Sequence, residues 1–312
     1  MVLTAAYGGA KWSPRTASMR EDMAEAWGDW GVSSEVGRLR AVLLRRPGPE
    51  LDEIIDFEAV QMRADLRPDD ARAQHDALAD AYRAHGVAVH YVERGRPDKP
   101  NAMFVRDLML MTPEGAIVTR PASTVRAGEE RLVAEALATA GVPILMSVHG
   151  RGTFEGADVC WVDRDLCFLA EGLRTNREGA DQVERMLREI GVRDVVRVGL
   201  PYGAMHLDGL LAILDRDLAV VWPKRTPHTV AQTLLERGFR LIHVEDEREA
   251  NTRLPMNFVA LAPGEILMPA GGDRLRAAYE VAGVTCHTVD ISELIKAGGG
   301  IHCMTGFLRR EE

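Results

Sequence analysis

Five side chains that can take part in catalysis recur along the sequence at intervals of about 50 residues. In chain order they are Asp107, Glu155, His206, Asn257 and Cys303. A cysteine thiolate is a nucleophile, and histidine is the side chain that most readily moves protons near neutral pH. These residue types therefore suit covalent catalysis, in which a thiol attacks, an imidazole transfers protons and carboxylates orient the reacting groups.

A second aspartate, Asp208, stands two residues after His206 in the segment MHLD. Side chains two residues apart on a strand share a face, so we expect this carboxylate beside the imidazole. Asp107 and Asp208 would suit a planar cation that donates paired hydrogen bonds, above all a guanidinium. The predicted catalytic set is Cys303, His206, Glu155, Asp107 and Asp208.

Each of these residues also has a structural interpretation. Cys303 alone could be a small buried hydrophobe, His206 a core histidine and Glu155 a turn or cap residue. With His302, the set His206, Asp208 and Cys303 could also be read as metal ligands. A metal site would require the pair His206 and Asp208 and the pair His302 and Cys303 to converge on one ion. We therefore expect no metal.

The elements expected around these residues repeat in a fixed order. Strand, short turn, strand, helix and strand follow one another in four segments, at 107–147, 157–199, 209–244 and 258–289. Turn-forming residues stand at matching places between the paired strands, for example Asp-Arg-Asp at 163–165.

A fifth copy would use both ends of the chain. Strand 303–309 would pair with strand 40–46, and a helix at 68–85 and a strand at 87–93 would complete the unit. One such unit cannot bury both faces of its sheet, so repeats of this length predict a shared core and a closed ring. An ordinary mixed α/β sandwich is the alternative.

Residues 1–37 are expected to form a leader or helical arm, and 38–312 a single catalytic domain. A helix is predicted over 18–30, with Trp12, Trp27 and Trp30 packing it onto the body or onto a neighbouring subunit. A homo-oligomer is therefore one possible assembly.

Composition excludes several classes of protein. The 312 residues are 46% hydrophobic with a net charge of −9, which is typical of a globular chain and argues against nucleic acid as the partner. We find neither a run of ~18 apolar residues nor a secretory signal. Four scattered cysteines predict no disulfide framework, so a reducing cytoplasm is expected. The glycine run 298–300 fits no phosphate-binding motif, and no cofactor is predicted.

Five motifs, taken together and in order, resemble the guanidino-group-modifying superfamily of arginine deiminases, dimethylarginine dimethylaminohydrolases and glycine amidinotransferases. The resemblance is strongest to a short arginine deiminase. The motifs are PN-x-x-F-x-RD at 100–107, EG-x-D at 155–158, RTN at 174–176, MHLD at 205–208 and GGG-x-x-C ending at 303. The segment 34–51 also resembles the usual first strand of that branch.

The resemblance implies an α/β fold: a five-bladed α/β propeller of ββαβ units, with the last blade closed by both termini. It also implies metal-free covalent catalysis on a small guanidino substrate. Cys303 would attack the guanidinium carbon, while Asp107 and Asp208 hold its nitrogens. His206 would protonate the leaving amine and then activate water, and Glu155 would position the group.

Further residues are expected to bind the substrate. Arg126 and Arg174 follow Asp107 and Glu155 at a spacing similar to that of the arginines that bind the α-carboxylate in arginine deiminases. Both could instead be helix-start or surface residues. The substrate-binding set is completed by Asn101, Phe104 and Asn257.

Several activities stay open. The leading prediction is an amidine hydrolase acting on arginine or a close relative, with a citrulline-type product. An amidinotransferase is an alternative, because GGGIHC at 298–303 also resembles the ending of that branch. A dimethylarginine dimethylaminohydrolase, and an arginine dihydrolase supported by Asn101 or Asn257, are others. A binding propeller without turnover would require a missing site residue. Ala297 and the glycines at 298–300 stand where arginine deiminases carry an arginine near the nucleophile. The absence of this arginine favours a wider range of substrates.

Overall fold

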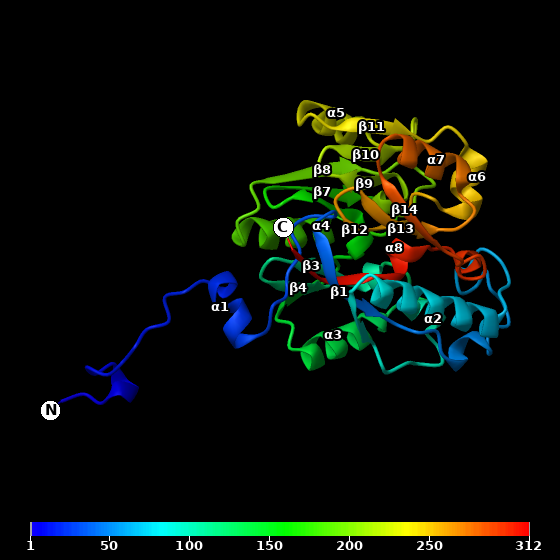
Figure 1. The fold of residues 1–312 in the computed structure, drawn as a ribbon. Coiled ribbons are helices and arrows are strands. Elements are labelled where there is room, and N and C mark those ends of the chain that lie inside the picture. The colour runs from blue at the N-terminus through cyan, green and yellow to red at the C-terminus, as the bar shows by residue number, and fades with distance from the viewer. Residues whose placement is uncertain (1, 312) are drawn as a thin grey trace.

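The computed structural model describes residues 2–311 as five three-stranded sheets arranged around a common centre (Figure 1). All five sheets have the same topology. The first two strands are antiparallel, the second and third are parallel, and a helix lies between the second and third. The ββαβ repeat predicted from the sequence is therefore confirmed.

Four sheets are each continuous in sequence. The first contains β3 (Met109–Thr112), β4 (Gly115–Val118), α3 (Glu129–Ala140) and β5 (Ile144–Ser147). The second contains β6 (Val159–Asp163), β7 (Leu166–Glu171), α4 (Arg177–Glu189) and β8 (Asp194–Gly199). The third contains β9 (Leu211–Asp215), β10 (Leu218–Val221), α5 (His228–Glu236) and β11 (Arg240–His243). The fourth contains β12 (Val259–Ala262), β13 (Glu265–Pro269), α7 (Asp273–Val281) and β14 (Thr285–Val289).

The fifth sheet closes the ring with strands from both ends of the chain. It contains β15 (Gly306–Glu311), β1 (Arg38–Leu44), α2 (Pro68–Ala84) and β2 (Ala88–Tyr91). β15 contacts β3 on one side and β1 contacts β12 on the other. The C-terminal strand therefore fills the position that a continuous unit would give to its own first strand.

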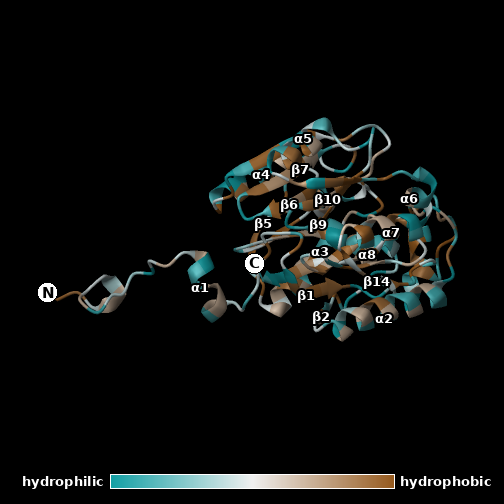
Figure 2. Ribbon diagram, turned by 45° about the horizontal axis from the view of Figure 1, so that its top comes forward, coloured by the Kyte–Doolittle hydropathy of each residue, from teal (hydrophilic) through white to brown (hydrophobic). Residues whose placement is uncertain are grey.

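Burial falls from the centre of the ring outward, as Figure 2 shows by brown strands inside and teal helix surfaces outside. β3, β4, β10 and β12 are buried at every position, whereas β5 and β11 are exposed at both ends. A strand buried on both faces must be apolar throughout, which explains the continuous Val, Leu, Ile and Ala runs. Among the described residues, we find no helix long and apolar enough to span a membrane.

Hairpin turns contribute their own hydrogen bonds. In the turn between β6 and β7, Oδ1 of Asp163 accepts from the backbone N–H of Asp165 at 2.8 Å and of Leu166 at 3.0 Å. This local side-chain bond is the reason Asp favours such turns. The turn positions predicted from the sequence are confirmed by these hairpins.

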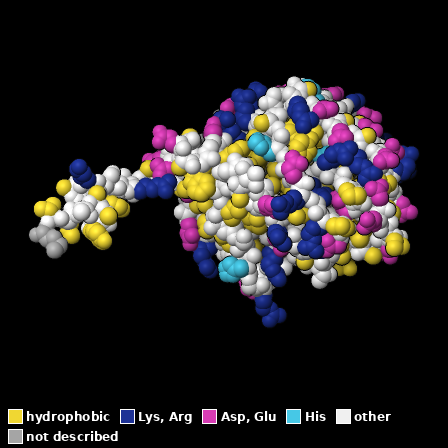
Figure 3. All heavy atoms as spheres, turned by 90° about the horizontal axis from the view of Figure 1, so that it is seen from below, with side chains coloured by type: hydrophobic (Ala, Val, Ile, Leu, Met, Phe, Trp, Pro, Cys, Tyr) yellow, Lys and Arg dark blue, Asp and Glu magenta, His cyan; other side chains and the backbone are white. Residues whose placement is uncertain are grey.

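The N-terminal segment differs from expectation. α1 (Met19–Ala26) is capped by Ser18 and Glu21 but ends four residues before Trp30. Trp30 contacts the ring of His90, whereas the side chains of Trp12 and Trp27 stay 60% and 45% exposed. Figure 3 shows this arm extending from the otherwise compact surface. The segment 31–37 by contrast enters the ring, where Val36 is buried in one of the two core clusters.

Two further expectations need correction. The strand predicted at 303–309 begins only at Gly306, because residues 301–304 form the short helix α8 (Ile301–Met304). The helix α6 (Glu247–Arg253) was not predicted, since it is a short polar insertion between β11 and β12 whose N-cap bonds come from Asp246. The remaining short elements are 3₁₀ turns: η1 (Ala5–Tyr7), η2 (Pro49–Leu51), η3 (Pro100–Met103), η4 (Val105–Leu108), η5 (Gly156–Asp158), η6 (Leu207–Gly209) and η7 (Leu294–Ala297).

Candidate active site

The five recurring residues occupy comparable positions, about two to five residues before the first strand of each sheet. Asp107 lies in η4, Glu155 and His206 are the N-cap residues of η5 and η6, Asn257 precedes β12, and Cys303 lies in α8. They therefore sit in turns and not on strands. The expected reason for the closeness of His206 and Asp208, strand alternation, is wrong.

Cys303 and Asn257 hold each other through two contacts. The Cys303 backbone N–H donates to Oδ1 of Asn257 at 3.2 Å, and Nδ2 of Asn257 lies 3.1 Å from the Cys303 sulfur. Oδ2 of Asp208 lies 3.7 Å from the same sulfur. Burial, reinforced by the carboxylates of Asp208 and Asp107, raises the pKa of the Cys303 thiol well above its ordinary value. Both effects favour the neutral thiol over the thiolate.

Glycines make this arrangement possible. Gly298 has φ +106°, a left-handed conformation that favours glycine. A Cβ on Gly299 would lie 2.5 Å from the Phe104 ring, and one on Gly300 would lie 2.7 Å from Oδ1 of Asn257. The glycine run therefore allows the chain to pass tightly behind Cys303.

His206 is held between carboxylates. Its Nε2 lies 2.7 Å from Oε2 of Glu155, and its Nδ1 lies 3.9 Å from Oδ1 of Asp107. Burial disfavours the imidazolium, but Asp107, Glu155 and Asp158 outweigh it, so the pKa of His206 is raised. The pKa of Glu155 shifts in the opposite direction. Burial would raise it, but His206 and two arginines outweigh burial and lower it. The pair is an imidazolium beside a carboxylate.

Both arginines predicted at the site are buried there. Arg174 contacts both oxygens of Glu155 at 3.3 Å through one terminal nitrogen. Arg126 contacts Asp107 through one terminal nitrogen and donates from Nε to Glu129 at 2.8 Å. Its second terminal nitrogen lies 3.4 Å from the carbonyl oxygens of residues 101 and 104. Arg126 is thus bound on every side by the protein, whereas Arg174 is tied mainly to Glu155.

These residues converge on one pocket. Its lining includes Asn101, Phe104, Asp107, Arg126, Arg174, Met205, His206 and Cys303. Asn101 donates from Nδ2 to the carbonyl oxygen of Val60 at 2.6 Å and so fixes the segment that carries Gln61 over the pocket. The structure brings all predicted site residues together, with Asp208 and Asn257 lining an adjoining larger cleft that shares His206 and Cys303.

One acceptor in the pocket is unused. Among the described residues, no hydrogen-bond donor reaches Oδ1 of Asp107, although this atom is buried. A buried carboxylate oxygen without a donor costs free energy, on the order of 1–3 kcal/mol or more. It is therefore placed to accept from a ligand.

A metal could also be considered at this point. The ligand atoms of Asp107, Glu155 and His206 all lie within 4.8 Å of one another. However, the guanidinium of Arg126 contacts Asp107 and lies 3.7 Å from Glu155, and Arg174 also contacts Glu155. Arginine guanidinium groups therefore already occupy oxygens of both carboxylates, and a metal ion would have to displace these contacts.

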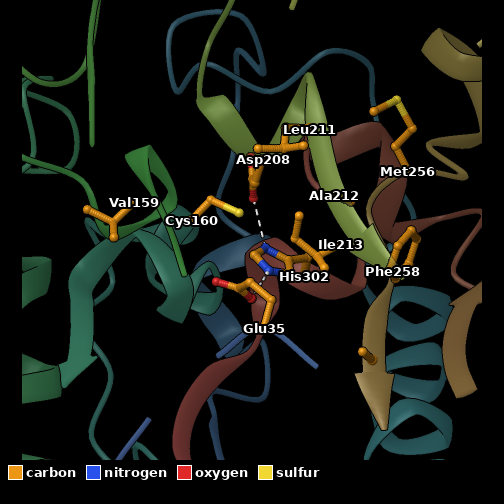
Figure 4. A pocket seen from close by; sticks show the side chains of 11 residues that line it. Glu35, Val159, Cys160, Asp208, Leu211, Ala212, Ile213, Met256, Phe258 and His302 are labelled. Atoms are coloured by element: carbon orange, nitrogen blue, oxygen red, sulfur yellow. Dashed lines mark hydrogen bonds and ion pairs between the residues drawn. The ribbon is translucent and has the colours of Figure 1, made fainter. Parts of the chain in front are cut away.

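A second group of charges lies behind the nucleophile, and its contacts were not predicted from the sequence. His302 lies with Nδ1 3.0 Å from Oδ2 of Asp208 and with Nε2 3.4 Å from Oε2 of Glu35, as the dashed lines in Figure 4 show. Glu35 in turn accepts from a terminal nitrogen of Arg106 at 3.2 Å. His302 and Arg106 belong to the recognised motifs, whereas no pattern pointed to Glu35.

These contacts set the charge of each group. Burial alone would neutralise Glu35, but Arg106 and His302 lower its pKa to about 2. Burial would lower the pKa of His302, but its contacts with Asp208 and Glu35 outweigh burial and raise it. Burial would raise the pKa of Asp208, but His302 outweighs burial and lowers it. Asp208 is therefore kept ionised next to Cys303.

Asp158, in the EG-x-D motif, was not assigned a role from the sequence. Its Oδ2 accepts from the Thr175 hydroxyl at 2.6 Å, and its Oδ1 accepts from the backbone N–H of Leu207 at 3.2 Å. Leu207 directly follows His206, so this buried carboxyl fixes the turn that carries the imidazole.

Comparison with known proteins gives a consistent result. A family described as "N,N dimethylarginine dimethylhydrolase, eukaryotic" matches residues 56–310. A dimethylarginine dimethylaminohydrolase of Pseudomonas aeruginosa is 30% identical over 245 residues, covering 77% of this chain and 89% of the relative. One of Streptomyces coelicolor is 28% identical over 270 residues, covering 86% of this chain and 97% of the relative.

Solved structures agree on the fold. The citrulline complex of a Pseudomonas aeruginosa dimethylarginine dimethylaminohydrolase variant is 25% identical with a TM-score of 0.73, covering 87% of this chain and 100% of that one. The resemblance read from the motifs was strongest to arginine deiminases, and the family match specifies the dimethylarginine dimethylaminohydrolase branch of the same superfamily.

Proposed function

Because the chain belongs to the dimethylarginine dimethylaminohydrolase family of guanidino-modifying enzymes, we propose that it hydrolyses arginine or an ω-methylated arginine through Cys303. The products would be citrulline and ammonia or a methylamine. The observation that carries this proposal is the convergence of Cys303, His206 and two carboxylates on one pocket, with Oδ1 of Asp107 unused.

A guanidinium fits this pocket by charge and by hydrogen bonding. Its N–H groups would donate to Asp107 Oδ1 on one side and to Asp208 on the other, in the planar geometry that carboxylates prefer. The same carboxylates raise the pKa of the Cys303 thiol. A bound cation would oppose that effect, so the thiolate would form when the substrate is present, and the thiol proton would be released to solvent.

The covalent step would form a bond from the Cys303 sulfur to the guanidinium carbon. Collapse of the tetrahedral adduct would break a C–N bond, and the imidazolium of His206 would give its proton to the departing amine. The neutral imidazole would then take a proton from water as it attacks the thiouronium carbon. Breaking the C–S bond would release the ureido product and return Cys303. Glu155 would hold the imidazole throughout, at the 2.7 Å contact.

For the amino-acid end of the substrate, Arg174 is the better candidate of the two arginines. It lines the pocket and uses one terminal nitrogen on Glu155, while Arg126 already contacts Asp107 and Glu129. We assign Arg174 to the α-carboxylate, with Arg126 shaping the pocket next to Asn101 and Phe104.

The test is a product assay on the purified full-length chain. Arginine, monomethylarginine and asymmetric dimethylarginine are supplied separately, and citrulline, ammonia and methylamines are measured. We expect citrulline from at least one of them and none from the Cys303→Ser variant. The proposal would be refuted if none of the three substrates gave citrulline.

Amidino transfer is a second candidate, favoured by the larger cleft beside the nucleophile. Cys303, His206 and Asn257 line this cleft together with Trp222 and Arg225, so an acceptor amine bound there would lie beside the nucleophile. Transfer would give ornithine from arginine only when an acceptor such as glycine is added. The same assay with and without glycine distinguishes the two reactions.

For the assembly and compartment, we propose a homo-oligomer acting in a reducing cytoplasm, with no nucleic-acid partner. The four cysteines are free thiols, which suits that compartment. Tyr7, Trp12 and Trp27 on the N-terminal arm are 77%, 60% and 45% exposed, so their rings are free to pack against a second copy of the chain. Sedimentation velocity of the full chain and of a variant without residues 1–29 tests this, and a monomeric full chain would refute it.

A further inference from the structure

Three side chains that commonly bind metals meet on elements other than those of the active site: His85, Glu265 and His287. Nε2 of His287 lies 3.0 Å from Oε1 of Glu265, and Nδ1 of His85 lies 3.9 Å from the same oxygen. The two imidazole rings are in contact, with centroids 4.2 Å apart. All three ligand atoms lie within 4.8 Å of one another.

The cluster lies at a seam between two sheets of the ring. His85 is the C-cap residue of α2, which belongs to the sheet closed by both termini. Glu265 begins β13, and His287 lies in the parallel neighbour β14, two positions beyond the residue paired with Glu265. The three residues are far apart in sequence, so only the closed ring brings them together.

The donor set and its spacing match a particular class of ion. Zn²⁺ is held at about 2.0–2.2 Å by imidazole nitrogens and carboxylate oxygens, which places neighbouring tetrahedral ligands about 3.3 Å apart. The two distances to Glu265, 3.0 and 3.9 Å, lie on either side of that value, and the two imidazole nitrogens lie within 4.8 Å of each other. Two imidazoles do not suit Mg²⁺ or Ca²⁺, which prefer oxygen ligands.

The surroundings also suit a cation. The C-terminal end of α2 carries the negative end of the helix dipole. The side chains of His85, Glu265 and His287 are 26%, 33% and 35% exposed, so an ion can enter from solvent and water can take the fourth position. We propose that His85, Glu265 and His287 form a binding site for a divalent transition metal, with Zn²⁺ as the best match, which ties α2 to β13 and β14.

The ion would stabilise the closed ring. A metal that binds the folded chain but finds no preformed site in the unfolded chain raises the midpoint of thermal unfolding. Here it would link the sheet built from both termini to its neighbour. This proposal does not depend on the reaction at Cys303.

The experiment must separate this cluster from the active site, whose residues could also take up zinc. We would use the full-length Cys303→Ser/His206→Asn protein as the background, with His85→Asn and His287→Asn added singly. His149→Asn serves as the matched control, because His149 is also exposed but lies in a different sheet region. Zinc binding is measured by titration calorimetry, Co²⁺ by its visible absorption, and stability by thermal unfolding with ZnCl₂ or MgCl₂.

We expect one equivalent of zinc in the background protein and in the His149→Asn control. We also expect an unfolding midpoint raised by ZnCl₂ and not by MgCl₂. Both cluster variants should weaken zinc binding at least tenfold, because loss of an outer-shell partner alone already costs about 10–100-fold. No zinc binding in the background protein, or equal binding in both cluster variants, would overturn the proposal. Unfolding curves without metal show whether each variant is folded.

Discussion

Nδ1 of His302 lies 3.0 Å from Oδ2 of Asp208, and the same oxygen lies 3.7 Å from the sulfur of Cys303. The carboxylate that approaches the nucleophile is therefore held from behind by an imidazole whose pKa is raised. Glu35 holds the other nitrogen of that imidazole. The segment 31–37, which precedes the first strand, thus takes part in organising the site.

We predict that His302→Gln lowers kcat/KM by about 10–100-fold, which corresponds to the loss of one hydrogen bond between charged groups, about 1.5–3 kcal/mol. Glutamine can donate one hydrogen bond to Asp208 but carries no charge, so the pKa of Asp208 should rise. The measurement is the pH profile of kcat/KM, in which the acid limb should move to higher pH. A purely structural role for His302 would change thermal stability and leave the shape of the profile as in the wild type.

The thiol of Cys303 should alkylate slowly at neutral pH, because burial and the carboxylates of Asp208 and Asp107 raise its pKa. Its reaction with the neutral reagent iodoacetamide should accelerate with pH, and Asp208→Asn should move this profile to lower pH by removing a negative charge. Mass spectrometry of the labelled peptide gives the rate.

The labelling experiment has an internal control. Cys286 is a partly exposed thiol outside the pocket, with its pKa raised to about 11 mainly by burial. Its labelling should be the same in Asp208→Asn as in the wild type. An unchanged profile for Cys303 in this variant would contradict the charge argument.

The lowered pKa of Glu35 predicts how the free energy of unfolding depends on pH. Its pKa is lowered in the folded chain, from 4.5 to about 2, so its stabilising contribution is present above pH 4.5 and is lost as the pH falls toward 2. The shift corresponds to an upper limit of about 3 kcal/mol. Glu35→Gln should therefore lower the free energy of unfolding at pH 7.

The difference between wild type and Glu35→Gln should shrink as the pH is lowered from 5 to 3. Urea unfolding at several pH values measures it. Glu311→Gln is the control, since Glu311 forms a salt bridge with Arg40 in which both side chains are about two-fifths exposed, and it should cost less than about 1 kcal/mol. A constant difference across this pH range would show that Glu35 acts through packing alone.

Arg174→Gln should raise KM for arginine at least about tenfold, because it removes a charge-assisted hydrogen bond to the α-carboxylate. Agmatine, which lacks this carboxylate, should show no such change. Steady-state kinetics with both substrates tests the assignment. An equal loss with arginine and agmatine would mean that Arg174 acts only through Glu155.

The ββαβ repeat and the candidate catalytic residues could be predicted from the sequence because their signals are local or periodic. Turn residues such as Asp163 form bonds within a few residues, and strands buried on both faces must be continuously apolar. The spacing of Asp107, Glu155, His206, Asn257 and Cys303 followed from one position repeated in each unit. Because a ring brings equivalent positions to its centre, the convergence of these residues could be predicted.

Only the tertiary structure decided how the groups are partnered. The helical turns at Asp107, His206 and Cys303 are too short to leave a periodic signal, so strands were expected in their place. The contact from Glu35 to His302 joins residues 267 positions apart, and Glu265 meets His85 across a seam between two sheets. Such contacts depend on how the ring closes, because the direction of a side chain between elements is set by packing and not by its neighbours in sequence.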